Sequence, residues 1–281
     1  MQELRGKVAV VTGAASGIGG ALAERFVAEG MAVALADVEE DALAARARAL
    51  ASTGARVLAV RTDVSRAADV EALAEHALAA FGAIHVVCNN AGVFTGGLTW
   101  EAPLADYEWV LGVNVWGVIH GIRTFVPILL RQGTAGHIVN TASMAGLTAM
   151  PYAGIYHMSK HAVIGLSECL HHELTLSGAL VKVSVLCPEM VATHIDAAER
   201  NRPAHLRLAN RTPTVSEEVI STAMRENIRT GAPPAEMAER VVQAIRAERF
   251  YVLSDDIWRR VCETRLDDIR AARNPTFAAP V

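Results

Sequence analysis

The sequence predicts an α/β fold: one domain built on a doubly wound, mostly parallel, seven-stranded sheet with helices on both faces. Two observations lead to this fold class. Short β-branched or aliphatic runs alternate with longer Ala- and Leu-rich segments of helical length. The short runs are apolar on both faces, as strands are when helices cover each side of a parallel sheet. A chain of 281 residues accommodates such a sheet without a second core.

The elements follow one another in a regular order. Strands are expected at Val8–Thr12, Ala32–Ala36, Arg56–Val60, Ile84–Asn89, His137–Thr141, Val181–Leu186 and Phe250–Leu253. Helices are expected at Gly19–Glu29, Glu39–Ala51, Ala67–Phe81, Asp106–Arg131, Tyr156–Ser177 and Ala235–Ala247.

The alternation stops at residues 190–230, which are polar, rich in Arg and Thr, and only weakly periodic. An insertion after the carboxyl edge of a sheet lies where ligands bind, so a substrate lid is expected there; the alternative is a tolerated surface excursion. We expect residues 1–255 to form a dinucleotide-binding catalytic domain that includes this lid. Residues 256–281 form a C-terminal tail, helical to about Ala272.

Composition excludes several classes of function. The net charge of −4 and the isoelectric point of about 6.2 provide no general attraction to nucleic acid or to an anionic membrane. The four cysteines are scattered without a CxxC pair, which argues against a zinc ribbon or a redox motif. The N-terminus runs directly into a strand, and no apolar run of membrane-spanning length is expected. These features predict a cytoplasmic protein.

A glycine-rich turn joins the first strand to the first helix. Between Thr12 and Gly19 the glycines follow a Gly-x3-Gly-x-Gly spacing, which lets the backbone approach a pyrophosphate at a helix N-terminus, as in a Rossmann-type fold. Asp37 ends the next strand about 20 residues later, where an acid meets the adenosine ribose. The uncharged neighbours Ala15, Ser16 and Val38 would not neutralise a 2′-phosphate, so NAD is favoured over NADP. The alternatives are an ordinary strand–helix turn and a solvated Asp37.

Tyr156 and Lys160 lie four residues apart at the start of a helical segment and therefore share one face. An ammonium beside a phenol favours the phenolate, so such a tyrosine can act as a general base toward an alcohol or as an acid toward a carbonyl. Taken alone, the pair is common on helices and has no diagnostic value.

The motifs taken together resemble the short-chain dehydrogenase/reductase family. They are, in chain order, Thr12–Gly19, Asp63, Asn89-Asn90-Ala91-Gly92, Asn114, Ser143, Tyr156-His157-Met158-Ser159-Lys160, and Pro188 to Thr193. The resemblance covers residues 5 to about 195. It implies an oxidoreductase that moves a hydride between a nicotinamide cofactor and its substrate.

The resemblance also implies roles for individual residues. Tyr156 would be the catalytic acid/base, and Lys160 would bind the nicotinamide ribose and lower the pKa of the tyrosine. Ser143 would hydrogen-bond the substrate oxygen, and Asn114 would hold a water that links Lys160 to solvent. Residues expected to contact the cofactor are Gly13, Ser16, Gly17, Ile18, Gly19, Asp37, Val38, Asp63, Val64, Asn90, Ala91, Gly92, Tyr156, Lys160, Pro188, Val191 and Thr193.

One position departs from the family pattern. After Pro188 the family usually has glycine, whereas this chain has Glu189. Its side chain could crowd the nicotinamide, project into the substrate pocket, bind a substrate hydroxyl or amine, or face solvent. Residues expected to contact substrate are Ser143, Met144, Tyr152, Tyr156, Glu189 and Met190, with Leu147 and Met150 as further walls. These mostly apolar, flexible side chains favour a hydrophobic or aromatic substrate over a polar sugar.

Two further expectations concern metals and assembly. His157 and His161 lie four apart on a helix, but no third ligand stands at a sensible spacing, so no metal site is expected. In many members of the family, the helices corresponding to Asp106–Arg131 and Tyr156–Ser177 pair across a dimer axis. A homodimer or homotetramer is therefore expected.

The function predicted from the sequence is NAD-dependent interconversion of a secondary alcohol and a ketone. One alternative is an NADPH-dependent carbonyl reductase of the same fold, which Asp37 argues against. The other is a non-enzymatic dinucleotide-binding sensor, which the intact set of Asn114, Ser143, Tyr156 and Lys160 argues against.

Overall fold

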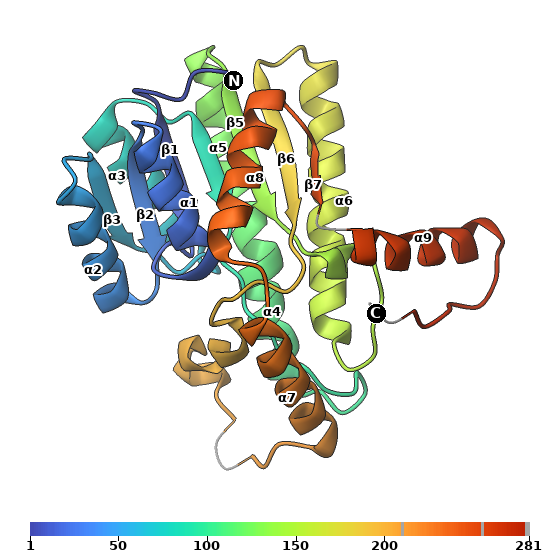
Figure 1. Ribbon diagram of the computed structural model, residues 1–281. Coiled ribbons are helices and arrows are strands. Elements are labelled where there is room, and N and C mark those ends of the chain that lie inside the picture. The colour runs from blue at the N-terminus through green and yellow to red at the C-terminus, as the bar shows by residue number, and fades with distance from the viewer. Residues whose placement is uncertain (209–210, 254–255, 279–281) are drawn as a thin grey trace.

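The fold is seen in a computed structural model that describes residues 1–208, 211–253 and 256–278. In these residues a seven-stranded, entirely parallel sheet has the order β3-β2-β1-β4-β5-β6-β7 and carries helices on both faces (Figure 1). The strands are β1 (Val8–Thr12), β2 (Ala32–Asp37), β3 (Val57–Arg61), β4 (Val86–Asn89), β5 (Gly136–Thr141), β6 (Val181–Cys187) and β7 (Tyr251–Leu253). The predicted fold class is confirmed.

Two layers of helices bury the two faces of the sheet. Helices α1 (Gly17–Ala28), α2 (Glu40–Ala51) and α8 (Pro234–Ala247) cover one face, and α3 (Ala67–Phe81), α5 (Gly117–Gln132) and α6 (Gly154–Leu176) cover the other. Alternating residues of one strand serve opposite layers, since Val11 packs in the first layer and Val10 in the second. This double burial explains why the central strands read as continuous apolar runs.

The helix expected at Asp106–Arg131 is continuous but contains a π-helical turn. It consists of α4 (Leu104–Leu111), a π-helical turn at Gly112–Trp116 and α5. Contrary to expectation, the continuous stretch Leu104–Gln132 is long and apolar enough to cross a membrane by length and composition alone. Its α5 part contributes Phe125, Val126 and Leu129 to the core beneath the sheet, as the core helix of a globular domain does.

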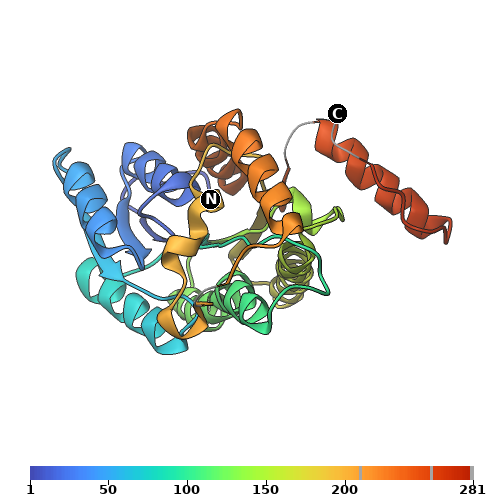
Figure 2. The ribbon, with the colours of Figure 1, turned by 90° about the horizontal axis from the view of Figure 1, so that it is seen from below.

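The 190–230 insertion is more regular than the sequence predicts. It contains 3-10 turns at Ile195–Asn201 and Ala204–Leu206 and the helix α7 (Val215–Arg229). The helix of the tail, α9 (Asp256–Arg270), projects from the body of the domain (Figure 2). Lid residues 209–210, the proposed domain boundary at 255 and the end of the tail at 279–281 lie outside the described residues.

Polar contacts fasten the carboxyl ends of the central strands to one another. The Thr12 hydroxyl accepts hydrogen bonds from the backbone N–H groups of Asn90 (2.9 Å) and Ala91 (3.1 Å) and donates to the Cys88 carbonyl. The Asn90 side chain donates to the Thr12 carbonyl and accepts from the Thr141 hydroxyl. The ends of β1, β4 and β5 are thereby held as one edge, at which the site is built.

The buried histidine His137 should make the free energy of unfolding depend on pH. His137 on β5 lies 2.8 Å from the Ser184 hydroxyl, and burial lowers its pKa to about 3. Below about pH 6.5 the unfolded chain binds a proton at this histidine and the folded chain does not. Acidification should therefore lower the free energy of unfolding by up to about 1.4 kcal/mol per pH unit from this group. His137→Gln removes that contribution.

Urea denaturation at a series of pH values tests this dependence. The stability difference between wild type and His137→Gln should shrink as the pH falls from about 6.5 toward about 4.5. The same substitution at exposed His76 controls for a generic loss of histidine. Parallel pH profiles for wild type and His137→Gln would show that the buried imidazole does not carry the effect.

Candidate active site

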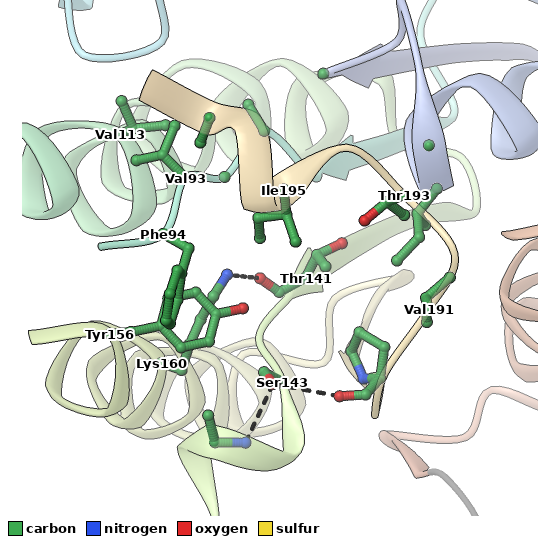
Figure 3. Close-up of a pocket in the computed structure, with 18 of the residues that line it drawn as sticks. Val93, Phe94, Val113, Thr141, Ser143, Tyr156, Lys160, Val191, Thr193 and Ile195 are labelled. Atoms are coloured by element: carbon green, nitrogen blue, oxygen red, sulfur yellow. Dashed lines mark hydrogen bonds between the residues drawn. The ribbon is translucent and has the colours of Figure 1, made fainter. Parts of the chain in front are cut away.

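A cavity of about 710 Å³ lies along the carboxyl edge of the sheet. Its walls come from the turn after β1, the ends of β2, β4, β5 and β6, the start of α6, and the 190–230 insertion. Figure 3 shows Thr141, Ser143, Tyr156 and Lys160 on one side of this space, with Val191, Thr193 and Ile195 opposite. Ligands of open α/β sheets bind in this position.

The glycine turn at one end of the cavity leaves no room for side chains. Gly17 has a φ of +53°, and a Cβ on it would lie 3.1 Å from the Thr193 methyl group. A Cβ on Gly19 would lie 2.1 Å from the Gly13 carbonyl oxygen. The turn therefore brings bare backbone to the cavity at the N-terminus of α1, where no acidic residue stands in the first turn. This arrangement suits a pyrophosphate.

Asp37 forms a fixed acceptor next to that turn. Its two carboxylate oxygens accept hydrogen bonds from the backbone N–H groups of Ala15 (3.0 Å) and Glu39 (3.1 Å). Burial raises the pKa of Asp37, and these two hydrogen bonds oppose the rise. Each oxygen keeps acceptor capacity toward the cavity, as a pair of ribose hydroxyls requires.

At the other end of the cavity, Tyr156 packs edge-on against Phe94, with their ring centroids 5.2 Å apart. Burial raises the pKa of Tyr156 to about 12, although a hydrogen bond with Ser143 opposes the rise. The Ser143 hydroxyl donates to the Pro188 carbonyl (3.2 Å) and accepts from the Ala145 N–H (3.1 Å). Two hydroxyl groups, one from the turn after β5 and one from α6, thus face the same part of the cavity.

Lys160 lies one turn beyond Tyr156 and is 3% exposed. Its Nζ donates to the Thr141 carbonyl (3.0 Å) and lies 5.4 Å from the centre of the Tyr156 ring. Burial lowers the pKa of Lys160 to about 8. The expected lowering of the tyrosine pKa by Lys160 is therefore not visible in the protein alone, where burial governs both groups.

The π-helical turn places Asn114 behind the site. Its side chain accepts from the Val93 N–H (2.9 Å) and donates to the Val93 carbonyl (3.0 Å) and the Ser159 hydroxyl (3.1 Å). This residue is buried and does not line the cavity. It connects the segment after β4 to the helix that carries Tyr156 and Lys160.

His157 fixes the wall of the cavity at residues 145–150. Its Nδ1 lies 2.7 Å from the Ala145 carbonyl and 2.9 Å from the Thr148 carbonyl, and its Nε2 accepts from the Met150 N–H. Both ring nitrogens are thereby engaged in hydrogen bonds with the backbone. Among the described residues no group of three His, Cys, Asp or Glu side chains is arranged to hold a metal ion.

Most of the residues predicted to form the site line this one cavity. Of the residues predicted to contact the cofactor, all except Gly19 line the cavity. Gly19 packs against Gly13 behind the turn. Glu189, Met144, Met150 and Met190 also line it.

The prediction that Tyr152 and Leu147 form walls of the substrate pocket is wrong, because neither residue lines the cavity. Tyr152 has a φ of +65° and is 39% exposed, and its carbonyl accepts from the Gly97 N–H (2.7 Å). The left-handed turn at Tyr152 directs the Tyr152 side chain toward solvent, whereas the nearby Met150 lines the cavity. Leu147 packs into the core beside Val163 and Ile164 instead.

Several lining residues come from parts of the chain that the sequence analysis did not connect with the site. Ile220, Met224 and Ile228 come from α7, and Ile257 and Trp258 come from α9. A sequence signal for α7 exists, since Thr214 and Glu217 form a capping box in which each side chain bonds the backbone of the other. Glu39, Arg200 and Asn201 line the opposite, Asp37 end, and their contact has no signal in the sequence.

Comparison with known proteins agrees with this geometry. The short chain dehydrogenase family model matches residues 7–204. A 1-deoxy-11-beta-hydroxypentalenate dehydrogenase of Streptomyces exfoliatus is 37% identical over 92% of this chain and 91% of its own, and a CLA biosynthesis dehydrogenase/reductase of Lactiplantibacillus plantarum is 32% identical over 96% and 95%. A crystal structure of a short chain dehydrogenase/reductase from Burkholderia phymatum in complex with NAD is 48% identical, with a TM-score of 0.97 and coverage of 99% of both chains.

Replacing Asn114 tests its role as the link behind the site. Asn114→Ala leaves the N–H and carbonyl of Val93 without their partner in a buried place, so the free energy of unfolding should fall by about 2–4 kcal/mol. Urea denaturation measures this loss. A loss below about 1 kcal/mol would mean that Val93 finds other partners and that Asn114 does not hold this segment.

Proposed function

Because the chain belongs to the short-chain dehydrogenase/reductase family, we propose that it is an NAD-dependent oxidoreductase that interconverts a hydrophobic secondary alcohol and its ketone. One observation carries the proposal. The Ser143 and Tyr156 hydroxyls and the Lys160 ammonium meet at one end of a cavity whose other end presents the glycine turn and Asp37. The residues present fit a nicotinamide dinucleotide laid along that cavity.

In this proposal the chain's own groups bind the substrate and move its proton. Ser143 turns its hydroxyl proton from the Pro188 carbonyl to the substrate oxygen, and Tyr156, as the phenolate, removes the alcohol proton. Lys160 holds the nicotinamide ribose and adds positive charge beside the phenol. The dinucleotide, when bound, supplies the hydride acceptor.

Because the site is buried, positive charge placed beside the Tyr156 phenol has a large effect on its pKa. Burial holds the pKa of Tyr156 at about 12 and that of Lys160 at about 8 in the protein alone. Additional positive charge near the phenol favours the phenolate and so lowers the pKa of Tyr156. An oxidised nicotinamide whose ribose is held by Lys160 would supply such charge. Proton removal is then promoted only when the hydride acceptor is in place.

The substrate end of the cavity supports a hydrophobic alcohol. Its walls include Phe94, Met144, Met150, Met190, Ile220, Met224 and Trp258. Flexible methionines and aromatic rings suit bulky apolar substrates, and Glu189 adds one carboxylate to this wall. A relative named as a dehydrogenase of a hydroxylated compound, the 1-deoxy-11-beta-hydroxypentalenate enzyme, is in keeping with this choice.

The proposal includes a cytoplasmic homodimer or homotetramer. Trp116, next to α5, is 53% exposed, and Met158 on α6 is 44% exposed. Exposed, large apolar side chains such as Trp116 and Met158 suit contact with a second copy of the chain.

Removing the phenolic hydroxyl tests the reaction mechanism. Tyr156→Phe keeps the ring against Phe94 but has no proton to exchange, so turnover of secondary alcohols with NAD should fall by about a hundredfold or more. Absorbance of the reduced nicotinamide follows the reaction, and NADH titration checks that the variant still binds cofactor. Turnover equal to that of wild type would overturn the mechanism.

Neutralising Asp37 tests the preference for NAD. Asp37→Asn keeps the shape of the side chain and removes its repulsion of a 2′-phosphate, so the ratio of kcat/KM for NADP to that for NAD should rise about tenfold. Glu40→Gln, an exposed neighbour that does not line the cavity, is the control and should leave the ratio unchanged. Wild-type turnover with NADP alone would favour the carbonyl reductase instead.

A further inference from the structure

The C-terminal helix α9 contributes to the cavity, although it lies beyond the part of the chain that the family model matches. That match ends at residue 204, whereas α9 begins at Asp256. The first turn of α9 places Ile257 and Trp258 in the cavity wall, and the later turns project from the body of the domain (Figure 2). The wall at this point is therefore built by a segment that the family model does not include.

Trp258 stands at the substrate end of the cavity, on the side of Ser143. The Trp258 side chain packs against a buried apolar cluster that includes Ala142 and Met144. These two residues flank Ser143 in the chain, and Met144, which is 1% exposed, lines the cavity as well. The indole is thus held beside the hydroxyl that would bind the substrate oxygen, away from the Asp37 end.

The chemistry of this wall favours a flat ring. Trp258 is half-buried, since it contacts the cluster and also lines the cavity. Phe94, Met190 and Met224 line the same cavity. Aromatic faces and the polarizable sulfur of methionine make favourable contacts with an aromatic ring that a saturated chain does not make.

We propose that Trp258 is a specificity-determining residue, whose indole stacks on an aromatic ring carried by the secondary alcohol. The inference rests on the proposed function, because the hydroxyl of that alcohol is taken to lie at Ser143 and Tyr156. An aryl carbinol, in which the carbon that bears the hydroxyl is bonded to the ring, fits the closeness of Trp258 to the residues that flank Ser143. A small aliphatic alcohol reaches Ser143 without reaching the indole.

Binding of naphthyl methyl carbinol tests the proposal without requiring turnover. In a calorimetric titration with NADH present no hydride acceptor is available, so the alcohol binds without reacting. Trp258→Ala should raise the Kd of the carbinol about tenfold. Trp258→Phe keeps a ring and should stay within about threefold of wild type, whereas Trp258→Leu keeps apolar bulk without a ring and should behave as Trp258→Ala does.

Turnover with NAD supplies a second readout that a purely structural role would not change. The ratio of kcat/KM for naphthyl methyl carbinol to that for isopropanol should fall about tenfold in Trp258→Ala, because isopropanol does not reach the indole. A general loss of structure would lower both values alike and leave the ratio unchanged. Trp100→Ala is the matched control, since Trp100 is 80% exposed and does not line the cavity. Its Kd and ratio should equal those of wild type.

The outcomes separate the role of Trp258 from the proposed reaction. If wild type binds the carbinol, Trp258→Ala weakens that binding and no alcohol is oxidised, the proposed reaction is wrong and the ring site stands. If wild type oxidises alcohols but Trp258→Ala changes neither the Kd nor the ratio, the role of Trp258 is wrong and the reaction stands. A ratio that rises in Trp258→Ala would show that the indole excludes aryl carbinols, which also overturns the stacking role.

Discussion

The hydrogen bonds around Thr12 and Asn90 are the contact on which the site depends. Parallel strands place their carboxyl ends at one edge of a sheet, but they do not fix the loops that leave those ends. Here the Thr12 hydroxyl and the Asn90 amide tie the exits of β1, β4 and β5 together. The glycine turn, the segment before Val93 and the strand end before Ser143 all start from this junction.

Burial sets the chemistry of the site that starts from this junction. Charge is costly in a buried site, so burial lowers the pKa of Lys160 to about 8, raises that of Tyr156 to about 12, and thereby disfavours the charged form of each group. Each becomes favourable when opposite charge or hydrogen-bond donors and acceptors are brought in by a ligand. At neutral pH these values keep Lys160 charged and Tyr156 neutral, so the phenol is the group whose protonation responds to added positive charge.

Local patterns in the sequence predicted most of the fold and much of the cavity. The ends of strands, the glycine turn and the four-residue spacing of Tyr156 and Lys160 are determined by neighbours in the chain, and the structure brings them to one cavity. The contact of Glu39 with Arg200 joins residues 161 positions apart across a segment of weak periodicity, and nothing local specifies it. Tyr152 was misplaced because a left-handed backbone turn, not the sequence spacing, determines where its side chain points.

Two nearby arginines of the 190–230 insertion make ion pairs of different kinds: Arg200 pairs with Glu39 at the surface, and Arg202 pairs with Asp106 in the interior. Arg202 is anchored on α4, which continues into the π-helical turn that holds Asn114 and, through it, Val93 and Ser159. The buried pair of Arg202 and Asp106 therefore belongs to the same packed region as the groups that handle the substrate proton, whereas the pair of Arg200 and Glu39 lies at the Asp37 end of the cavity, open to water and salt.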